Sequence, residues 1–370
     1  MRVSRLVLHH FRSYSRLDVS FPGRKNYLLG HNGEGKTNVL EALNFLSLGR
    51  SFRTRDASSL LQSGEKEASI YLEYENEKAE KHSLSCLLSK EGKRFALDGE
   101  KVTSLSKILG KLITVVYDPS LVFFFKDEPE RRRKLLDEVL SQLSKEYLYA
   151  LGRYKKLLKE RNAALQQNYD SDVINVLRDE LVNLSYRIST ERKRLVKALS
   201  GKATDYYSAL FGKEEKKCLT LVYKTNCPLD DDQKGFREHR KALYERSKSY
   251  ENIRHQTRVG PHRDDLCALL DGNDVSKYGS QGENRLASLS LKLSIASLYQ
   301  EKLGIVPILL LDDITSDLDE IRTENLLSLI GKEDQQVFVT GTRITKGFQD
   351  YQIYSVKDST LAKEETTDGR

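Results

Sequence analysis

The sequence predicts an α/β fold, in which a mixed sheet with helices forms one part and a second, mostly helical lobe forms the other. A glycine-rich octapeptide, residues 30–37, joins a short apolar strand to a helix-forming segment. A run of apolar residues, Pro307 to Leu311, is typical of a buried parallel strand and ends in two aspartates. Leucines at steps of three and four between residues 129 and 199 indicate the helical lobe.

The composition indicates a globular, moderately basic protein. The 370 residues suffice for a large core and two lobes, and the net charge of +7 is compatible with a nucleic-acid partner without demonstrating one. The four cysteines show no metal-binding spacing, as is typical of a reduced protein of the cytoplasm. No apolar run approaches the ~20 residues that span a bilayer. We therefore expect a cytoplasmic protein without a membrane segment.

The octapeptide has the pattern G-x-x-x-x-G-K-T, which cradles phosphate groups between a strand and a helix. Its glycines let backbone N–H groups turn toward an anion, and the following helix points its positive end at the same anion. Lys36 can reach the β- and γ-phosphates, and the Thr37 hydroxyl can bind Mg²⁺. The predicted nucleotide-binding residues here are Gly30, His31, Asn32, Gly33, Glu34, Gly35, Lys36, Thr37 and Asn38. Alone, the motif leaves kinase, GTPase and ATPase open.

The two aspartates lie at the carboxyl end of their strand, where open α/β sheets bind ligands. Asp312 is the natural Mg²⁺ partner of Thr37, so these two are the predicted metal ligands. Asp313 can point at an attacking water instead. We therefore predict Asp313 and Lys36 as the catalytic residues.

A third element, Tyr278 to Arg285, opens an apolar-periodic helix. Ser280 would cap this helix, and Glu283 follows as in a capping box. The turn is also placed like the signature motif of ATP-binding-cassette ATPases, where a serine binds the γ-phosphate held by the opposite subunit. Under this second interpretation, Ser280, Gln281, Gly282 and Glu283 bind nucleotide, and residues 316–319 resemble the D-loop of the same class.

The helical lobe is predicted to be a short antiparallel hairpin. Its periodicity breaks at residues 168–172, which gives two helices of roughly 30 residues and an arm roughly 45 Å long. The first 120 residues are expected to form a mixed sheet around the phosphate loop. The predicted domains are an ATPase head at 1–128 and 256–355, a helical arm lobe at 129–255, and an unstructured tail at 356–370.

Together these segments resemble the RecF family, a bacterial relative of the SMC ATPases, over nearly the whole chain. The resemblance rests on Leu8 to Tyr14, Gly30 to Leu43, Ser47 to Arg53, Arg131 to Arg133, Gly260 to Leu266, Tyr278 to Arg285 and Leu309 to Asp319. It implies an ABC-type P-loop ATPase head with a helical second lobe. Two departures from transporter ATPases fit this family: residues 340–342 lack a switch histidine, and Asp313 stands where most cassette ATPases have glutamate.

The resemblance implies a head-to-tail homodimer that closes around two ATP molecules with Mg²⁺ and clamps double-stranded DNA near single-strand junctions. The implied partners are RecR and RecO, which help to load RecA, and a weak, DNA-dependent ATP hydrolysis releases the dimer. It also places Arg12 near the nucleotide phosphates.

Contact with DNA is expected to be to the backbone, because no recognition helix, zinc finger or RRM pattern is found. For each basic run, a solvated helix face is the alternative interpretation. His262 and Arg263 are candidates for phosphate contacts or for pairs between the lobes. The predicted DNA-binding residues are Arg50, Arg53, Arg55, Arg131, Arg132 and Arg133.

Two other functions are compatible with a phosphate loop and an acidic strand. A transporter ATPase subunit would carry the switch histidine that residues 340–342 lack. An ATP-gated DNA-binding scaffold without turnover would keep every nucleotide-binding residue, so the sequence does not separate it from a slow ATPase.

Overall fold

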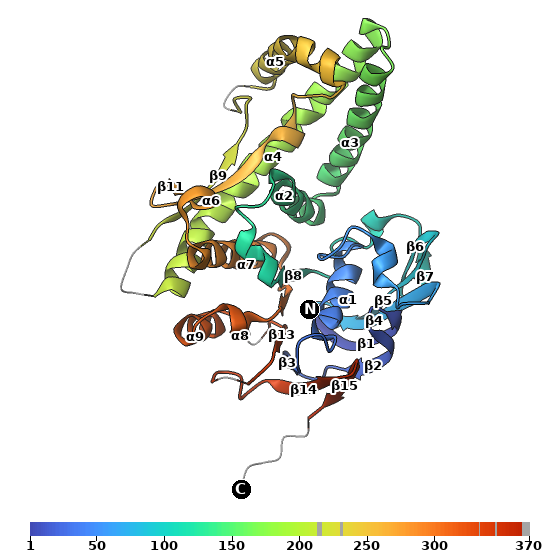
Figure 1. The fold of residues 1–370 in the computed structure, drawn as a ribbon, viewed down its shortest axis with the longest axis vertical. Coiled ribbons are helices and arrows are strands. Elements are labelled where there is room, and N and C mark those ends of the chain that lie inside the picture. Colours follow the sequence, from blue (N-terminus) through green and yellow to red (C-terminus); the bar gives the residue numbers. More distant parts are fainter. Residues whose placement is uncertain (213–216, 230–231, 333, 345, 365–370) are drawn as a thin grey trace. The chain divides into compact units, whose positions relative to one another are not determined.

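The structure is a computed structural model that describes residues 1–212, 217–229, 232–332, 334–344 and 346–364. The chain divides into two compact units (Figure 1). Unit 1 comprises Met1–Leu121, Ser208–Lys216 and Lys292–Arg370, and unit 2 comprises Val122–Tyr207 and Lys217–Leu291. Residues 256–291, which the sequence placed in the ATPase head, thus group with the helical unit, and the first boundary lies at Leu121 instead of 128.

Unit 1 contains two six-stranded sheets. The antiparallel sheet has the order β2-β1-β4-β5-β6-β7, with β1 at Arg2–Phe11, β2 at Tyr14–Ser20, β4 at Glu67–Glu75, β5 at Lys81–Ser89, β6 at Gly92–Leu97 and β7 at Glu100–Val102. The mainly parallel sheet has the order β15-β14-β3-β13-β12-β8, with β3 at Lys25–Leu29, β8 at Thr114–Tyr117, β12 at Ile308–Leu311, β13 at Val337–Gly341, β14 at Gln352–Lys357 and β15 at Thr360–Lys363. The prediction of one mixed sheet within the first 120 residues is wrong, because β3 and β8 pair with strands from the C-terminal part.

Helix α1 (Lys36–Leu48) packs between these two sheets, since it contacts β8 and β13 of one and β4 and β5 of the other. Almost all of its side chains are buried, as expected for a helix that is covered all round. The helix begins after Gly35, whose φ of +106° and close approach to Ser13 and Tyr14 suit glycine. Its N-terminus, and with it the octapeptide, is thereby fixed against both sheets.

The C-terminal strands correct the predicted tail. Tyr354 and Val356 are buried in β14, and the Tyr354 ring packs 5.2 Å from that of Phe21. The prediction of an unstructured segment is therefore wrong for residues 356–363, because β14 pairs with β3 and β15 pairs with β14, which extends the mainly parallel sheet. Residues 365–370 lie outside the described part of the chain. The other helices of unit 1 are α8 (Ile314–Asp317), α9 (Glu320–Leu329) and the short turns Ala57–Leu60 and Leu105–Lys107.

Unit 2 is mostly helical. Its helices are α2 (Pro129–Leu143), α3 (Lys145–Gln166), α4 (Ser171–Phe211, whose last turn belongs to unit 1), α5 (Gln233–Arg254), α6 (Val275–Tyr278) and the first half of α7 (Gln281–Leu303). A small sheet has the strand order β11-β10-β9, with β9 at Leu219–Lys224, β10 at Asp265–Leu270 and β11 at Asn273–Asp274. A 3-10 turn lies at Pro261–Arg263, and another, Pro119–Phe123, includes the point at which the chain passes from unit 1 to unit 2. Helices α3 and α4 run side by side as the predicted hairpin (Figure 1), joined by the salt bridge between Arg153 and Glu180.

The first arm of that hairpin is interrupted, which the periodicity did not predict. The Ser144 hydroxyl accepts the N–H of Tyr147 at 3.1 Å, so α2 ends and α3 begins at this cap. The return helix α4 has 41 residues and is longer than expected.

His262 lies inside unit 2. Its Nε2 faces the Thr257 carbonyl oxygen at 3.0 Å and is therefore the protonated nitrogen, so Nδ1 accepts the Tyr154 hydroxyl at 2.6 Å. Both ring nitrogens are used, so His262 is neither a phosphate contact nor a pair between lobes. Burial, together with the positive charges of Arg263, Arg133 and Arg240, lowers the pKa of His262 from 6.5 to about 4.

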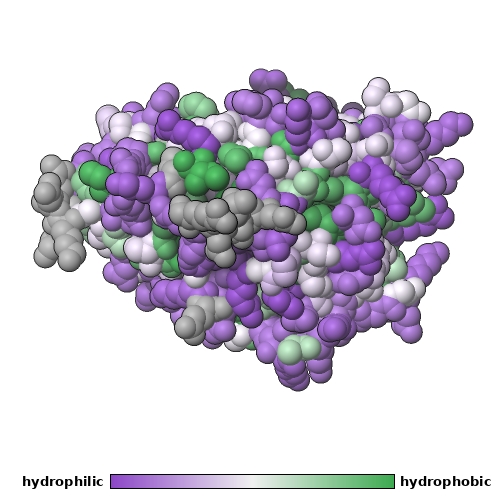
Figure 2. Space-filling model, turned by 90° about the horizontal axis from the view of Figure 1, so that it is seen from below, coloured by the Kyte–Doolittle hydropathy of each residue, from purple (hydrophilic) through white to green (hydrophobic). Residues whose placement is uncertain are grey.

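Within the described residues, no helix is long and apolar enough to cross a membrane. The face in Figure 2 is covered mainly by hydrophilic side chains, with small, scattered groups of hydrophobic ones.

The buried, neutral His262 predicts a pH dependence of stability. A lowered pKa means that the stability is complete above pH 6.5 and is lost as the pH falls toward 4, because the unfolded imidazole binds its proton first. We expect His262 to account for a loss of up to ~3 kcal/mol in the free energy of unfolding over this range. Urea unfolding followed by circular dichroism measures it. The difference between wild type and His262→Gln should shrink as the pH falls, and a constant difference would contradict the assignment.

Candidate nucleotide-binding site

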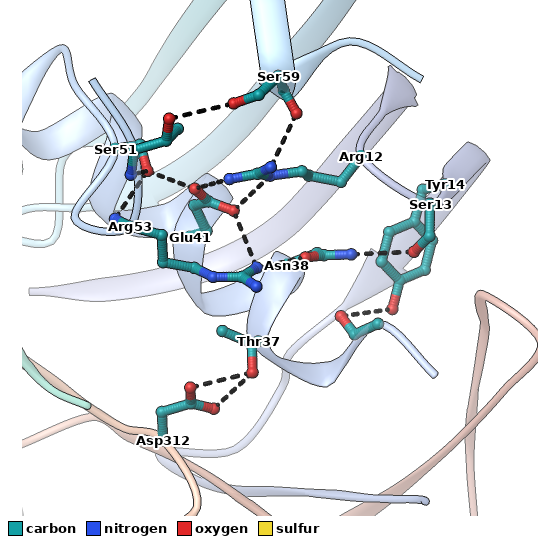
Figure 3. A network of polar contacts seen from close by, with 12 residues as sticks. Arg12, Ser13, Tyr14, Thr37, Asn38, Glu41, Ser51, Arg53, Ser59 and Asp312 are labelled. Atoms are coloured by element: carbon teal, nitrogen blue, oxygen red, sulfur yellow. Dashed lines mark hydrogen bonds and ion pairs between the residues drawn. The ribbon is translucent and has the colours of Figure 1, made fainter. Parts of the chain in front are cut away.

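Three parallel strands bring the phosphate loop and the acidic pair together. Strand β13 pairs with β3, which leads into the loop, and with β12, which leads into Asp312. The Thr37 hydroxyl lies 2.9 and 3.0 Å from the two carboxylate oxygens of Asp312 (Figure 3), although these residues are 275 positions apart. The predicted pairing of Thr37 with Asp312 is thus present in the structure.

The loop surrounds the Lys36 ammonium. Lys36 Nζ donates to the carbonyl oxygens of Gly30 and His31 at 2.6 and 2.7 Å. Burial lowers the pKa of Lys36, and the negative charges of Asp313, Glu34 and Asp312 oppose that shift. A Cβ at Gly30 would lie 2.3 Å from the Val356 carbonyl oxygen, so only glycine fits where the loop leaves β3.

Glu34 places a negative charge at the loop. Its carboxylate accepts the backbone N–H of His31, one of the donors that a phosphate group would use. A bound phosphate and this carboxylate would repel each other. The Glu34 carboxylate would therefore rotate away from the His31 N–H when a phosphate binds, so the predicted contribution of Glu34 to nucleotide binding is that of its backbone N–H.

The Asp312 carboxylate is suited to a divalent cation. It is 6% exposed, and burial raises its pKa, as do the like charges of Asp118 and Asp313, whereas the hydroxyls of Thr340 and Thr37 lower it. Hydroxyl and carboxylate oxygens are the ligands that Mg²⁺ prefers. Together, Thr37 and Asp312 fit the predicted metal.

Asp313 is held in a strained backbone conformation. Its φ of 49° and ψ of 35° are left-handed, which costs a non-glycine residue about 1–3 kcal/mol. The backbone N–H of Asp313 donates to the Thr340 hydroxyl at 2.9 Å, and its carboxylate accepts the Ser316 hydroxyl at 2.8 Å. The Asp313 carboxylate thus has a different hydrogen-bond partner from the Asp312 carboxylate, which accepts from Thr37 and Thr340. In the predicted D-loop, the side chain of Asp317 lies outside what the structure describes.

Glu41, on α1, is a residue that the sequence analysis missed. Its carboxylate is fully buried and accepts two hydrogen bonds from Arg12, at 2.7 and 2.8 Å, and one from the Ser51 hydroxyl (Figure 3). Arg53 lies 3.5 Å from the same carboxylate and donates to Asn38 Oδ1 at 3.0 Å. An acidic residue inside an otherwise apolar helix stretch was the available signal, since a buried carboxylate needs such partners.

The turn before α7 is a capping box. The Ser280 hydroxyl accepts the N–H of Glu283 at 3.2 Å, and the Glu283 carboxylate accepts the N–H of Ser280 at 2.8 Å. Glu283 also binds Lys217 at 3.0 Å. The capping-box interpretation is therefore correct for the local geometry, and the Glu283 carboxylate caps the helix and pairs with Lys217. Ser280 is exposed and keeps its hydroxyl proton as a donor, so capping leaves the signature-motif hypothesis for Ser280, Gln281 and Gly282 as a prediction.

Known proteins are similar to this chain over nearly its whole length. The family described as "RecF/RecN/SMC N terminal domain" matches residues 2–360. The DNA replication and repair protein RecF of Halalkalibacterium halodurans is 36% identical, over 98% of this chain and 100% of its own length. The chain belongs to the RecF family.

Further relatives agree with this assignment. The RecF protein of Limosilactobacillus reuteri is 34% identical over 99% of this chain and 100% of its own. The solved structure of "the recombination mediator protein RecF-ATP in RecFOR pathway" superposes with a TM-score of 0.90 at 28% identity, covering 98% of this chain and 97% of that one. An SMC head bound to the C-winged helix domain of ScpA, at 16% identity and a TM-score of 0.58, shares the fold. The predicted family, ABC-type head fold and role in DNA replication and repair are confirmed.

Arg12, which the RecF resemblance placed near the phosphates, is largely occupied. Besides Glu41, its guanidinium donates to the Ser59 carbonyl oxygen at 2.8 Å. Among the described residues, three of its five N–H groups have an acceptor, which leaves two for a ligand. Contact between Arg12 and a nucleotide stays a prediction.

The predicted DNA-binding arginines fall into two groups. Arg132 is 6% exposed, and its guanidinium donates to both carboxylate oxygens of Asp265 at 2.8 and 2.9 Å. It also donates to three backbone carbonyl oxygens, so the prediction that Arg132 binds DNA is wrong. Its neighbours are also engaged, Arg131 with Asp127 and Arg133 with the Asp264 carbonyl oxygen at 2.8 Å. The first run, Arg50, Arg53 and Arg55, lies half-buried or exposed in unit 1, with Arg53 in contact with Glu41 and Asn38, and its contact with DNA stays a prediction.

The Glu41 network predicts a stability effect. Glu41→Gln keeps the side-chain volume but leaves the Arg12 guanidinium without its countercharge, so we expect the free energy of unfolding to fall by ~3 kcal/mol. Urea unfolding by circular dichroism measures this. Glu67→Gln is the matched control, because its ion pair with Arg94 is exposed and should contribute less than ~1 kcal/mol. If both substitutions lower the free energy of unfolding equally, the buried Glu41–Arg12 pair contributes no more to stability than an exposed ion pair.

Proposed function

We propose that this protein binds ATP with Mg²⁺ at the Thr37–Asp312 site and dimerises on DNA in response. The observation that carries the proposal is the contact of the Thr37 hydroxyl with both oxygens of Asp312, at 2.9 and 3.0 Å, beside the Lys36 ammonium. The RecF–ATP structure that superposes over 98% of the chain supports ATP as the nucleotide.

Each residue has a separate role in this proposal. The loop N–H groups and Lys36 bind the phosphates, while Thr37 and Asp312 would hold Mg²⁺, which neutralises phosphate charge when bound. Asp313 accepts a hydrogen bond from the attacking water and orients it toward the γ-phosphate. Ser280 donates its hydroxyl proton to the γ-phosphate bound by the other copy, so each nucleotide joins two chains.

The proposed nucleic-acid partner is duplex DNA near single-strand junctions. Arginines that include Arg50, Arg53 and Arg55 would contact its phosphates. RecR, with RecO, is the proposed partner, and loading of RecA is the proposed outcome. The name "RecFOR pathway", carried by the related structures, supports this assignment. Slow hydrolysis then opens the dimer and releases it from DNA.

Mass measurement by light scattering tests the proposal directly. With ATP and Mg²⁺ the mass of the wild-type protein should double, and duplex DNA should favour the doubled form. Lys36→Ala should lose ATP binding and stay monomeric. Ser280→Arg should bind ATP like wild type but stay monomeric, because the larger side chain stands where the other copy's γ-phosphate would lie.

Ser249→Arg is the matched control for Ser280→Arg, since Ser249 is an exposed serine on α5 of the same unit and should leave dimerisation unchanged. An ATP-dependent dimer formed by Ser280→Arg would reject the shared site and leave the capping box as the only role of this turn.

Asp313→Asn separates binding from hydrolysis. Asparagine adopts the left-handed backbone about as readily as aspartate and still accepts a hydrogen bond from Ser316, but it loses the charge that orients water. We expect ATP affinity within about twofold of wild type and hydrolysis slower by about 10²-fold or more, with a longer-lived dimer. Calorimetry and phosphate release measure these quantities. Undiminished hydrolysis would exclude Asp313 as the water-orienting group, and no hydrolysis even in the wild type would favour the ATP-gated scaffold.

A further inference from the structure

Thr340, at the end of β13, connects the two aspartates. Its hydroxyl donates to Asp312 Oδ1 at 2.7 Å and accepts the backbone N–H of Asp313 at 2.9 Å. The side chain is fully buried. One hydroxyl therefore sets both the orientation of the predicted metal ligand and the backbone of the predicted water-orienting residue.

The sheet register places Thr340 there. Val339 pairs with Leu311, so the next residue on each strand is Thr340 beside Asp312. The following residue is fixed as well, because a Cβ at Gly341 would lie 2.0 Å from the Tyr27 hydroxyl. The end of β13 is thus closely packed, and the Thr340 hydroxyl has little freedom to leave Asp312.

The hydroxyl also supports the backbone of Asp313. The left-handed conformation at Asp313 is unfavourable, and the hydrogen bond from its N–H to Thr340 stabilises it. The Thr37 hydroxyl also donates to Asp312, but of these two hydroxyls only that of Thr340 contacts Asp313 as well.

From these contacts we infer that Thr340 is a positioning residue, which keeps Asp312 ready for the metal and Asp313 aimed at the attacking water. The inference rests on the proposed ATP and Mg²⁺ function. Thr340 belongs to the segment 340–342, where transporter ATPases carry a switch histidine. Thr340 acts on the site through the two aspartates that it contacts.

The test compares Thr340→Val, which keeps the shape and removes the hydroxyl, with Thr340→Ser, which keeps the hydroxyl. Calorimetry gives ATP affinity in EDTA and its dependence on Mg²⁺ concentration, and phosphate release at saturating Mg²⁺ gives hydrolysis. Thr340→Val should bind ATP like wild type in EDTA, need about tenfold more Mg²⁺ for half of its Mg²⁺-dependent gain in affinity, and hydrolyse at least about tenfold more slowly. Thr340→Ser should restore both properties to within about threefold of wild type.

Thr114→Val is the matched control. Thr114 is a buried threonine on β8 of the same sheet, and its hydroxyl accepts a hydrogen bond from Asn44 at 3.0 Å. This variant loses the same atom, so it reports the general cost of a missing buried hydroxyl and should leave the Mg²⁺ dependence unchanged.

The outcomes separate the inference from the function on which it rests. If wild type shows no Mg²⁺-dependent ATP binding, the proposed function fails. If wild type shows it and Thr340→Val has the same Mg²⁺ midpoint and rate, Thr340 only fills the core and the inference fails. Equal changes in Thr340→Val and Thr114→Val, or no recovery in Thr340→Ser, would also overturn it.

Discussion

The pairing of β13 with both β3 and β12 is the constraint on which the candidate nucleotide-binding site depends. Parallel neighbours end at the same edge of a sheet, so the segments that follow β3 and β12 meet there although most of the chain separates them. The same pairing places Thr340 between the two aspartates. A shift of one residue in the register of β13 would turn Thr340 to the other face and separate these groups.

Buried charges organise the surroundings of this edge. Helix α1 is covered by two sheets, so the one carboxylate in its middle, Glu41, has no access to water and is compensated by protein groups. These groups come from the β1–β2 turn, through Arg12, and from the segment after α1, through Ser51 and Arg53. The network thereby joins three separate pieces of chain around the phosphate loop, and the hydrogen bond from Arg53 to Asn38 extends it to the residue next to Thr37.

The sequence predicted what local chemistry determines. The phosphate loop, the acidic strand and the capping box each occupy a few consecutive residues, and the structure places them as expected. The division into two sheets was missed, because strand pairing over hundreds of residues leaves no local pattern. The break at Ser144 was missed because leucine periodicity continues across it. Arg132 and His262 were misjudged because polar residue type suggests exposure, whereas their ion-pair and hydrogen-bond partners lie elsewhere in the chain.

Strand β3 has both of its neighbours, β13 and β14, at the opposite end of the chain, and Asn26 contacts the Val337 carbonyl across 311 positions. During synthesis, therefore, the antiparallel sheet can form from early residues while β3 still waits for partners. The loop that follows β3 acquires its support only after β13 and β14 have left the ribosome. A translation product truncated before β13 would thus carry the complete phosphate-loop sequence without the sheet that shapes it. The conformation of the phosphate loop therefore depends on the synthesis of strands that follow it by about 300 residues.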